Sequence, residues 1–68
     1  MLQQRRLHIR TRKQALEDLF LAIRKDLLNK GVIKENAEAV ARAVYMRATY
    51  DDNMTIEKIN AMRDAFLK

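Results

Sequence analysis

Residues 11–32 read TRKQALEDLFLAIRKDLLNKGV and carry both the start signal and the end signal of one long helix. The first four residues, from Thr11 to Gln14, have the Thr-x-x-Gln form of a capping box, in which two side chains satisfy backbone N–H groups at the helix start. Near the other end, Gly31 can adopt the left-handed conformation that terminates a helix. The stretch therefore predicts a helix over residues 11–30.

Apolar side chains in this segment recur every three or four residues, which places them on one face of the helix. They are Leu16, Leu19, Phe20, Ile23 and Leu27. Leu21 and Leu28 lie roughly 120–140° around from that stripe, at about 100° per residue, and share a second apolar line. Either the third helix covers this line, or the line is an interface with another subunit or partner.

Two further helices are expected at about residues 34–50 and 55–68. The inner face of the second helix consists of small side chains: Ala37, Val40, Ala41, Val44 and Ala48. Residues 51–53, Asp-Asp-Asn, end it because their side chains compete for backbone hydrogen bonds. Thr55 is the expected cap of the third helix, whose apolar stripe is Ile56, Ile59, Met62 and Phe66. The fold class is therefore all-α or mainly α: a single helical domain over residues 11–68, preceded by an arm over residues 1–10.

Length and composition limit what such a domain can be. A chain of 68 residues buries little surface, so a disulfide, a metal or a second chain usually reinforces it. The sequence has no Cys and one His, which excludes disulfides and the common zinc sites. We therefore expect a homodimer without a cofactor or metal. The longest apolar run has five residues, against about 20 for a membrane span, so we expect a cytoplasmic protein without a membrane partner.

Groups that could carry catalysis are nearly absent from the sequence. There is no glycine-rich phosphate loop and no Cys or Ser nucleophile. The adjacent carboxylates of Asp51 and Asp52 lack EF-hand spacing. Glu35 and Glu38 fit a solvated first helical turn, where the helix dipole favours acidic residues. We expect that the chain is not an enzyme.

The formal charge of +5 is confined to the first thirteen residues. That segment has five cationic side chains and no acidic one, whereas the remaining residues include nine of each sign. The five cations are Arg5, Arg6, Arg10, Arg12 and Lys13. A basic arm on a neutral body is typical of a protein that binds an anionic partner, and such cations gain affinity for nucleic acid by releasing counterions from phosphates.

Residues 5–12 fit more than one conformation. Arg6, His8, Arg10 and Arg12 alternate with apolar Leu7 and Ile9, the period-two pattern of a half-buried strand. A backward extension of the first helix is the alternative, and a solvated tail is the third. The strand is preferred because an extended helix would not need a cap at Thr11. Two such strands would suit the DNA major groove, whereas an arginine-rich helix would suit an RNA or DNA backbone groove.

The order of the arm and the first two helices resembles the ribbon-helix-helix DNA-binding regulators. The matching stretches are RRLHIRT at residues 5–11, the helix that follows, KGV at residues 30–32 and NAEAVARAV at residues 36–44. In that family a short N-terminal strand pairs with its copy in a dimer and its polar side chains face the major groove. The resemblance implies that Arg6, His8 and Arg10 read base edges. The third helix lies outside it.

These observations lead to one main hypothesis and one rival. The main hypothesis is a small dimeric nucleic-acid-binding protein, with DNA favoured over RNA, that acts as a regulatory factor, for example in transcription, or as an accessory factor. Its contacts would be Arg5, Arg6, His8, Arg10, Arg12 and Lys13. The rival is a helical protein-binding adaptor or inhibitor that docks on a larger protein assembly through Leu21 and Leu28.

Overall fold

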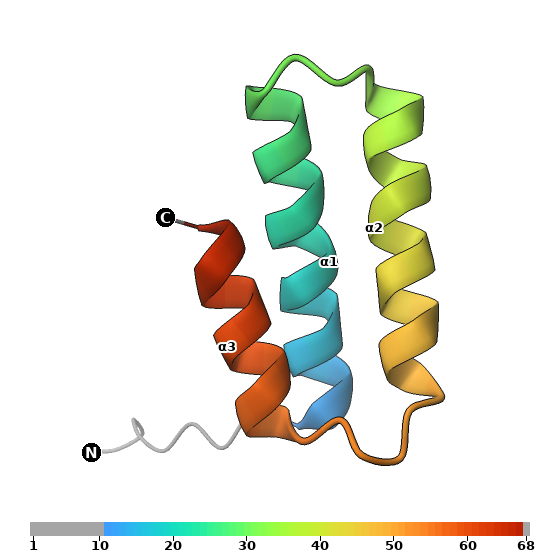
Figure 1. Ribbon diagram of the computed structural model, residues 1–68, viewed down its shortest axis with the longest axis vertical. Helices are drawn as coiled ribbons and strands as arrows, with labels where there is room; N and C mark the ends of the chain where they lie inside the picture. The colour runs from blue at the N-terminus through green and yellow to red at the C-terminus, as the bar shows by residue number, and fades with distance from the viewer. Residues whose placement is uncertain (1–10, 68) are drawn as a thin grey trace, which may run out of the picture.

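The computed structural model describes residues 11–67, which form three α-helices. They are α1 (Arg12–Asn29), α2 (Lys34–Thr49) and α3 (Ile56–Phe66). The central helix is α1, with α2 antiparallel to it on one side and α3 on another (Figure 1). α2 and α3 make almost no contact with each other. The prediction of a three-helix domain is confirmed, and no strand occurs within residues 11–67.

The start of α1 has the predicted capping box. The hydroxyl of Thr11 accepts a hydrogen bond from the backbone N–H of Gln14 at 3.1 Å. In return, the Thr11 N–H donates to Oε1 of Gln14 at 3.3 Å. Both bonds satisfy N–H groups that have no partner inside the helix. Thr11 is thus the cap, and the helix begins at the next residue.

The end of α1 is a Schellman motif at Gly31, the residue predicted to terminate the helix. Gly31 has a φ of 89°, in the left-handed region. The N–H of Val32 donates to the Leu27 carbonyl at 3.0 Å, and the N–H of Gly31 donates to the Leu28 carbonyl at 3.1 Å. This pair of bonds satisfies carbonyls of the last turn and reverses the chain toward α2.

Replacing Gly31 with Ala is expected to lower the free energy of unfolding by about 1 kcal/mol. A Cβ added at Gly31 would have no heavy atom within 4 Å, so the cost arises from the backbone conformation alone. Gly31→Asn should lose less, because Asn tolerates the left-handed region better. Urea denaturation followed by circular dichroism measures both. Equal losses for the two variants would contradict the conformational explanation.

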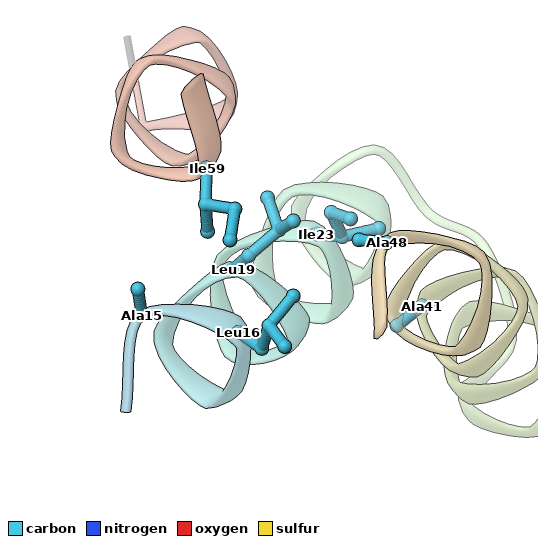
Figure 2. Close-up of a cluster of buried hydrophobic side chains, with 7 residues drawn as sticks. All are labelled: Ala15, Leu16, Leu19, Ile23, Ala41, Ala48 and Ile59. Carbon is cyan, nitrogen blue, oxygen red and sulfur yellow. The ribbon is translucent and has the colours of Figure 1, made fainter. Parts of the chain in front are cut away.

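The core is small and is built around α1 (Figure 2). Its buried cluster consists of Ala15, Leu16, Leu19 and Ile23 from α1, Ala41 and Ala48 from α2, and Ile59 from α3. The largest fully buried side chains are Leu19, Ile23 and Ile59. The alanines of α2 let α1 approach closely, but they contribute little apolar area. The core therefore gives this short chain limited hydrophobic stabilisation.

Two details of the shorter helices differ from expectation. α3 ends at Phe66 with Leu67 as its C-cap, two residues before the expected end. Val40 was expected on the inner face of α2, and this prediction is wrong because 48% of its surface is exposed. α2 packs on α1, and α3 adds almost no contact with it.

Candidate functional site

The six residues predicted to contact nucleic acid fall on both sides of the first described residue. Arg5, Arg6, His8 and Arg10 lie outside the described residues, as does most of the strand predicted over residues 5–12. The two remaining cations, Arg12 and Lys13, are the first two residues of α1.

Arg12 donates its guanidinium hydrogen bonds to backbone carbonyls within the domain. Its Nη2 lies 2.6 Å from the carbonyl oxygen of Ala48, 3.3 Å from that of Thr49 and 3.1 Å from that of Asp51. Its Nη1 lies 3.0 Å from the carbonyl oxygen of Met54. We call Arg12 and these four carbonyls the Arg12 clamp. Ala48 and Thr49 belong to the last turn of α2, where carbonyls carry partial negative charge, so a cationic donor is favourable there.

The Arg12 clamp joins the start of α1, the end of α2 and the loop that leads into α3. These three segments lie at the same end of the domain (Figure 1). The loop is ordered by its own hydrogen bonds as well. The N–H of Asn53 donates to Oδ1 of Asp51 at 2.9 Å, and the hydroxyl of Thr55 caps α3 by accepting from the N–H of Lys58 at 3.2 Å. Thr11, to which the arm is joined, is therefore fixed where these three segments meet.

Two exposed side chains lie close in sequence to the groups of the clamp. Lys13 is exposed on the first turn of α1. Tyr50, the C-cap of α2, is 80% exposed and stands between two residues whose carbonyls bind Arg12. Asp52, in the loop that follows Tyr50, is also exposed. A cation, a phenol and a carboxylate thus lie near the attachment point of the arm.

The second predicted surface, the line of Leu21 and Leu28, is open. Leu21 is 54% exposed and Leu28 is 37% exposed, so α3 does not cover the line. Grooves run on both sides of Leu21. The groove toward α2 is lined by Glu17, Phe20, Leu21, Arg42, Tyr45 and Met46. The groove toward α3 is lined by Asp18, Leu21, Ala22, Lys25, Arg63, Asp64 and Leu67.

Leu21 is thus a ridge between two grooves, and two apolar residues that the sequence did not indicate flank it. Met46 of α2 is 51% exposed, and Leu67 is 55% exposed. At about 100° per residue, Met46 lies roughly opposite the buried alanines of α2, and Leu67 is the C-cap of α3, so neither belongs to a predicted apolar stripe. We call the surface formed by Glu17, Leu21, Lys25, Leu28, Met46 and Leu67 the Leu21 face. Beneath its α2 side, Phe20 and Tyr45 pack edge to face with ring centroids 6.2 Å apart.

Residues 11–67 were also compared with the requirements of a metal site and of a membrane-spanning helix. Over that range no three His, Cys, Asp or Glu side chains are grouped so as to hold a metal ion. No helix in the same range combines the length and apolar character needed to cross a membrane.

No protein-family model, curated protein or solved structure matches the chain. The resemblance to ribbon-helix-helix regulators therefore stays a prediction from residues 5–44. The candidate functional surfaces are the attachment point of the arm beside the Arg12 clamp, and the Leu21 face.

Proposed function

We propose that the chain is a nucleic-acid-binding protein, with a regulatory or accessory role, whose basic arm contacts DNA. The observation that carries the proposal is the confinement of the +5 charge to the first thirteen residues of an otherwise neutral chain. Attachment of that arm at Thr11, next to the Arg12 clamp, supports it, because the clamp fixes the point on the domain from which the arm begins.

The cations of the arm divide into two roles under this proposal. The guanidinium of Arg12 is engaged by four carbonyls, so its part is to fix the start of the arm. Contacts with phosphates then fall to Arg5, Arg6, Arg10 and Lys13. His8 would add positive charge below neutral pH, since its unperturbed pKa is about 6.5. Tyr50 offers a hydroxyl that can donate to a phosphate oxygen.

Four phosphate contacts give a definite salt dependence. On duplex DNA, the logarithm of the affinity should fall with the logarithm of the salt concentration with a slope of about −3.6. Fluorescence anisotropy with a labelled duplex, titrated at several salt concentrations, measures this slope. Absence of binding at low salt would overturn the proposal. A parallel titration with duplex RNA of the same sequence tests the preference for DNA.

A matched pair of double variants separates the arm from net charge. Arg6→Gln/Arg10→Gln removes two arm cations and should reduce the slope by about 1.8, with an affinity loss of at least about tenfold at low salt. Lys30→Gln/Lys34→Gln removes the same charge from the opposite end of the domain, where both side chains are exposed. Its affinity should change less than about twofold. Equal losses for the two double variants would mean that net charge, and not the arm, determines binding.

A further inference from the structure

The Leu21 face has apolar side chains flanked by charged ones, and neither α2 nor α3 covers its leucines. The proposed contact of the arm with DNA does not use it. We propose that it is the interface of a two-fold symmetric homodimer, in which α1 of one copy packs antiparallel on α1 of the other about Leu21. In such an interface each copy presents the same surface, so the surface must be complementary to itself.

The order of charges along α1 has this self-complementarity. Glu17 and Asp18 precede Leu21 by four and three residues, and Arg24 and Lys25 follow it by three and four. Antiparallel packing about Leu21 brings the acidic turn of each copy level with the basic turn of the other. Parallel packing would bring like charges together, which disfavours it.

Two of these charged side chains are available for contacts between copies. Glu17 and Lys25 are both exposed, and neither makes an ion pair with another residue of the range 11–67. Arg24, in contrast, also lies 3.8 Å from Glu38 of α2 within the chain. Glu17 and Lys25 are therefore the pair on which the charge order can be tested.

The apolar part of the face has the shape that helix packing requires. Leu21 forms a ridge, and the grooves beside it run along α1 between Leu21 and the exposed side chains of Met46 and Leu67. Helices pack when side-chain ridges of one enter grooves of the other. With the two-fold axis at Leu21, each copy supplies the ridge and the grooves that the other needs.

A second copy fits this surface better than an unrelated partner for two reasons. In a two-fold symmetric dimer, the acidic turn before Leu21 must meet the basic turn after Leu21 of the other copy. Binding to an unrelated partner does not require charges of opposite sign on the two sides of Leu21. The core is also small: of its nine buried hydrophobic residues, five are alanines. A chain of this size commonly gains stability by burying further apolar surface in an oligomer.

The oligomeric state of the full chain tests the interface directly. Analytical ultracentrifugation over a concentration series, without nucleic acid, should give twice the chain mass of 8.0 kDa. Leu21→Lys should weaken dimerisation at least about 100-fold, because it places two like charges on the two-fold axis. Val40→Lys is the matched control, since Val40 is 48% exposed and does not line either groove. It should remain dimeric.

A charge-swap cycle tests the antiparallel arrangement. Glu17→Lys and Lys25→Glu should each weaken the dimer roughly tenfold or more, and the double variant Glu17→Lys/Lys25→Glu should restore it, because each lysine again faces an acidic residue. Far-UV circular dichroism verifies that every variant is folded. A monomeric wild-type chain, a dimer that survives Leu21→Lys, or a double variant that is no better than the singles would each overturn the proposal. A monomer that binds another protein through the Leu21 face would also overturn it.

Discussion

Arg12→Ala is expected to lower the free energy of unfolding by about 2–3 kcal/mol. The change removes one cationic donor that makes four hydrogen bonds, at 2.6 to 3.3 Å, to carbonyls at the end of α2 and in the following loop. A hydrogen bond from a charged group contributes about 1.5–3 kcal/mol, and the four are not additive because they share one side chain. Water can also reach part of this site, which keeps the loss below the sum.

Lys13→Ala is the matched control for the Arg12 clamp. It removes the same charge from the adjacent residue of the same helical turn, but the side chain is exposed, so the change should stay within about 0.5 kcal/mol. Arg12→Lys should fall between the two, since an ammonium keeps the charge without the planar fork. Urea denaturation at one fixed protein concentration compares all three. If Lys13→Ala were as destabilising as Arg12→Ala, charge and not the hydrogen bonds would explain the effect.

Ala41→Leu is expected to lower the free energy of unfolding by about 2–3 kcal/mol. Whereas Arg12→Ala removes interactions, this change adds atoms to a packed core. Ala41 is fully buried in the cluster that joins α2 to α1. A leucine there has no space at the close approach that the alanines permit, so it must separate the two helices or leave its preferred rotamers. For a domain of this size, the melting temperature should fall by roughly 10 °C or more.

Ala43→Leu provides the comparison for this substitution. Ala43 lies two residues further along α2 and is exposed, so the same added atoms meet solvent instead of α1. Alanine and leucine have similar helix propensities, and the melting temperature should therefore change little. A similar loss at both positions would contradict close packing between α1 and α2. Differential scanning calorimetry at one protein concentration measures both variants.

The two proposals, if combined, give the dimer a spacing that matters for DNA. Ten residues separate Thr11 from Leu21, so antiparallel packing about Leu21 would place the two Thr11 residues about 30 Å apart along the helix axes, at 1.5 Å per residue. Successive turns of the major groove are roughly 34 Å apart. Two basic arms could then reach neighbouring turns on one side of a duplex, and half-sites about one turn apart would bind best.

The ends of α1 could be predicted from sequence because their chemistry is local. A capping box spans four residues, and a Schellman motif needs a glycine just after the last turn. The role of Arg12 could not be predicted, because its acceptors lie 36 to 42 residues away in the chain. No neighbouring residue in the sequence distinguishes Arg12 from the exposed Lys13. Both were therefore predicted to contact nucleic acid.

The position of α3 also depended on contacts that periodicity does not reveal. The sequence left open whether α3 covers Leu21 and Leu28, the large side chains of the second line. In the structure, α3 lies instead on the side of α1 that carries Ala15, which is fully buried (Figure 2). The small side chain of Ala15 permits a closer approach of α3 to α1 than a leucine would. Leu21 and Leu28 therefore remain on the surface, where they form the candidate interface.

The contact of α3 with α1 alone has a consequence for how the native state opens. Local and sub-global unfolding begins in the elements with the fewest tertiary contacts. α3 is the shortest of the three helices and packs on one neighbour, whereas α1 packs on two. The α1–α2 hairpin can therefore persist while α3 leaves and returns, and breakage of the Arg12 hydrogen bond to Met54 would accompany each departure. We therefore expect α3 to open before the α1–α2 hairpin does, and Arg12, next to the arm, to lose one of its hydrogen bonds when α3 opens.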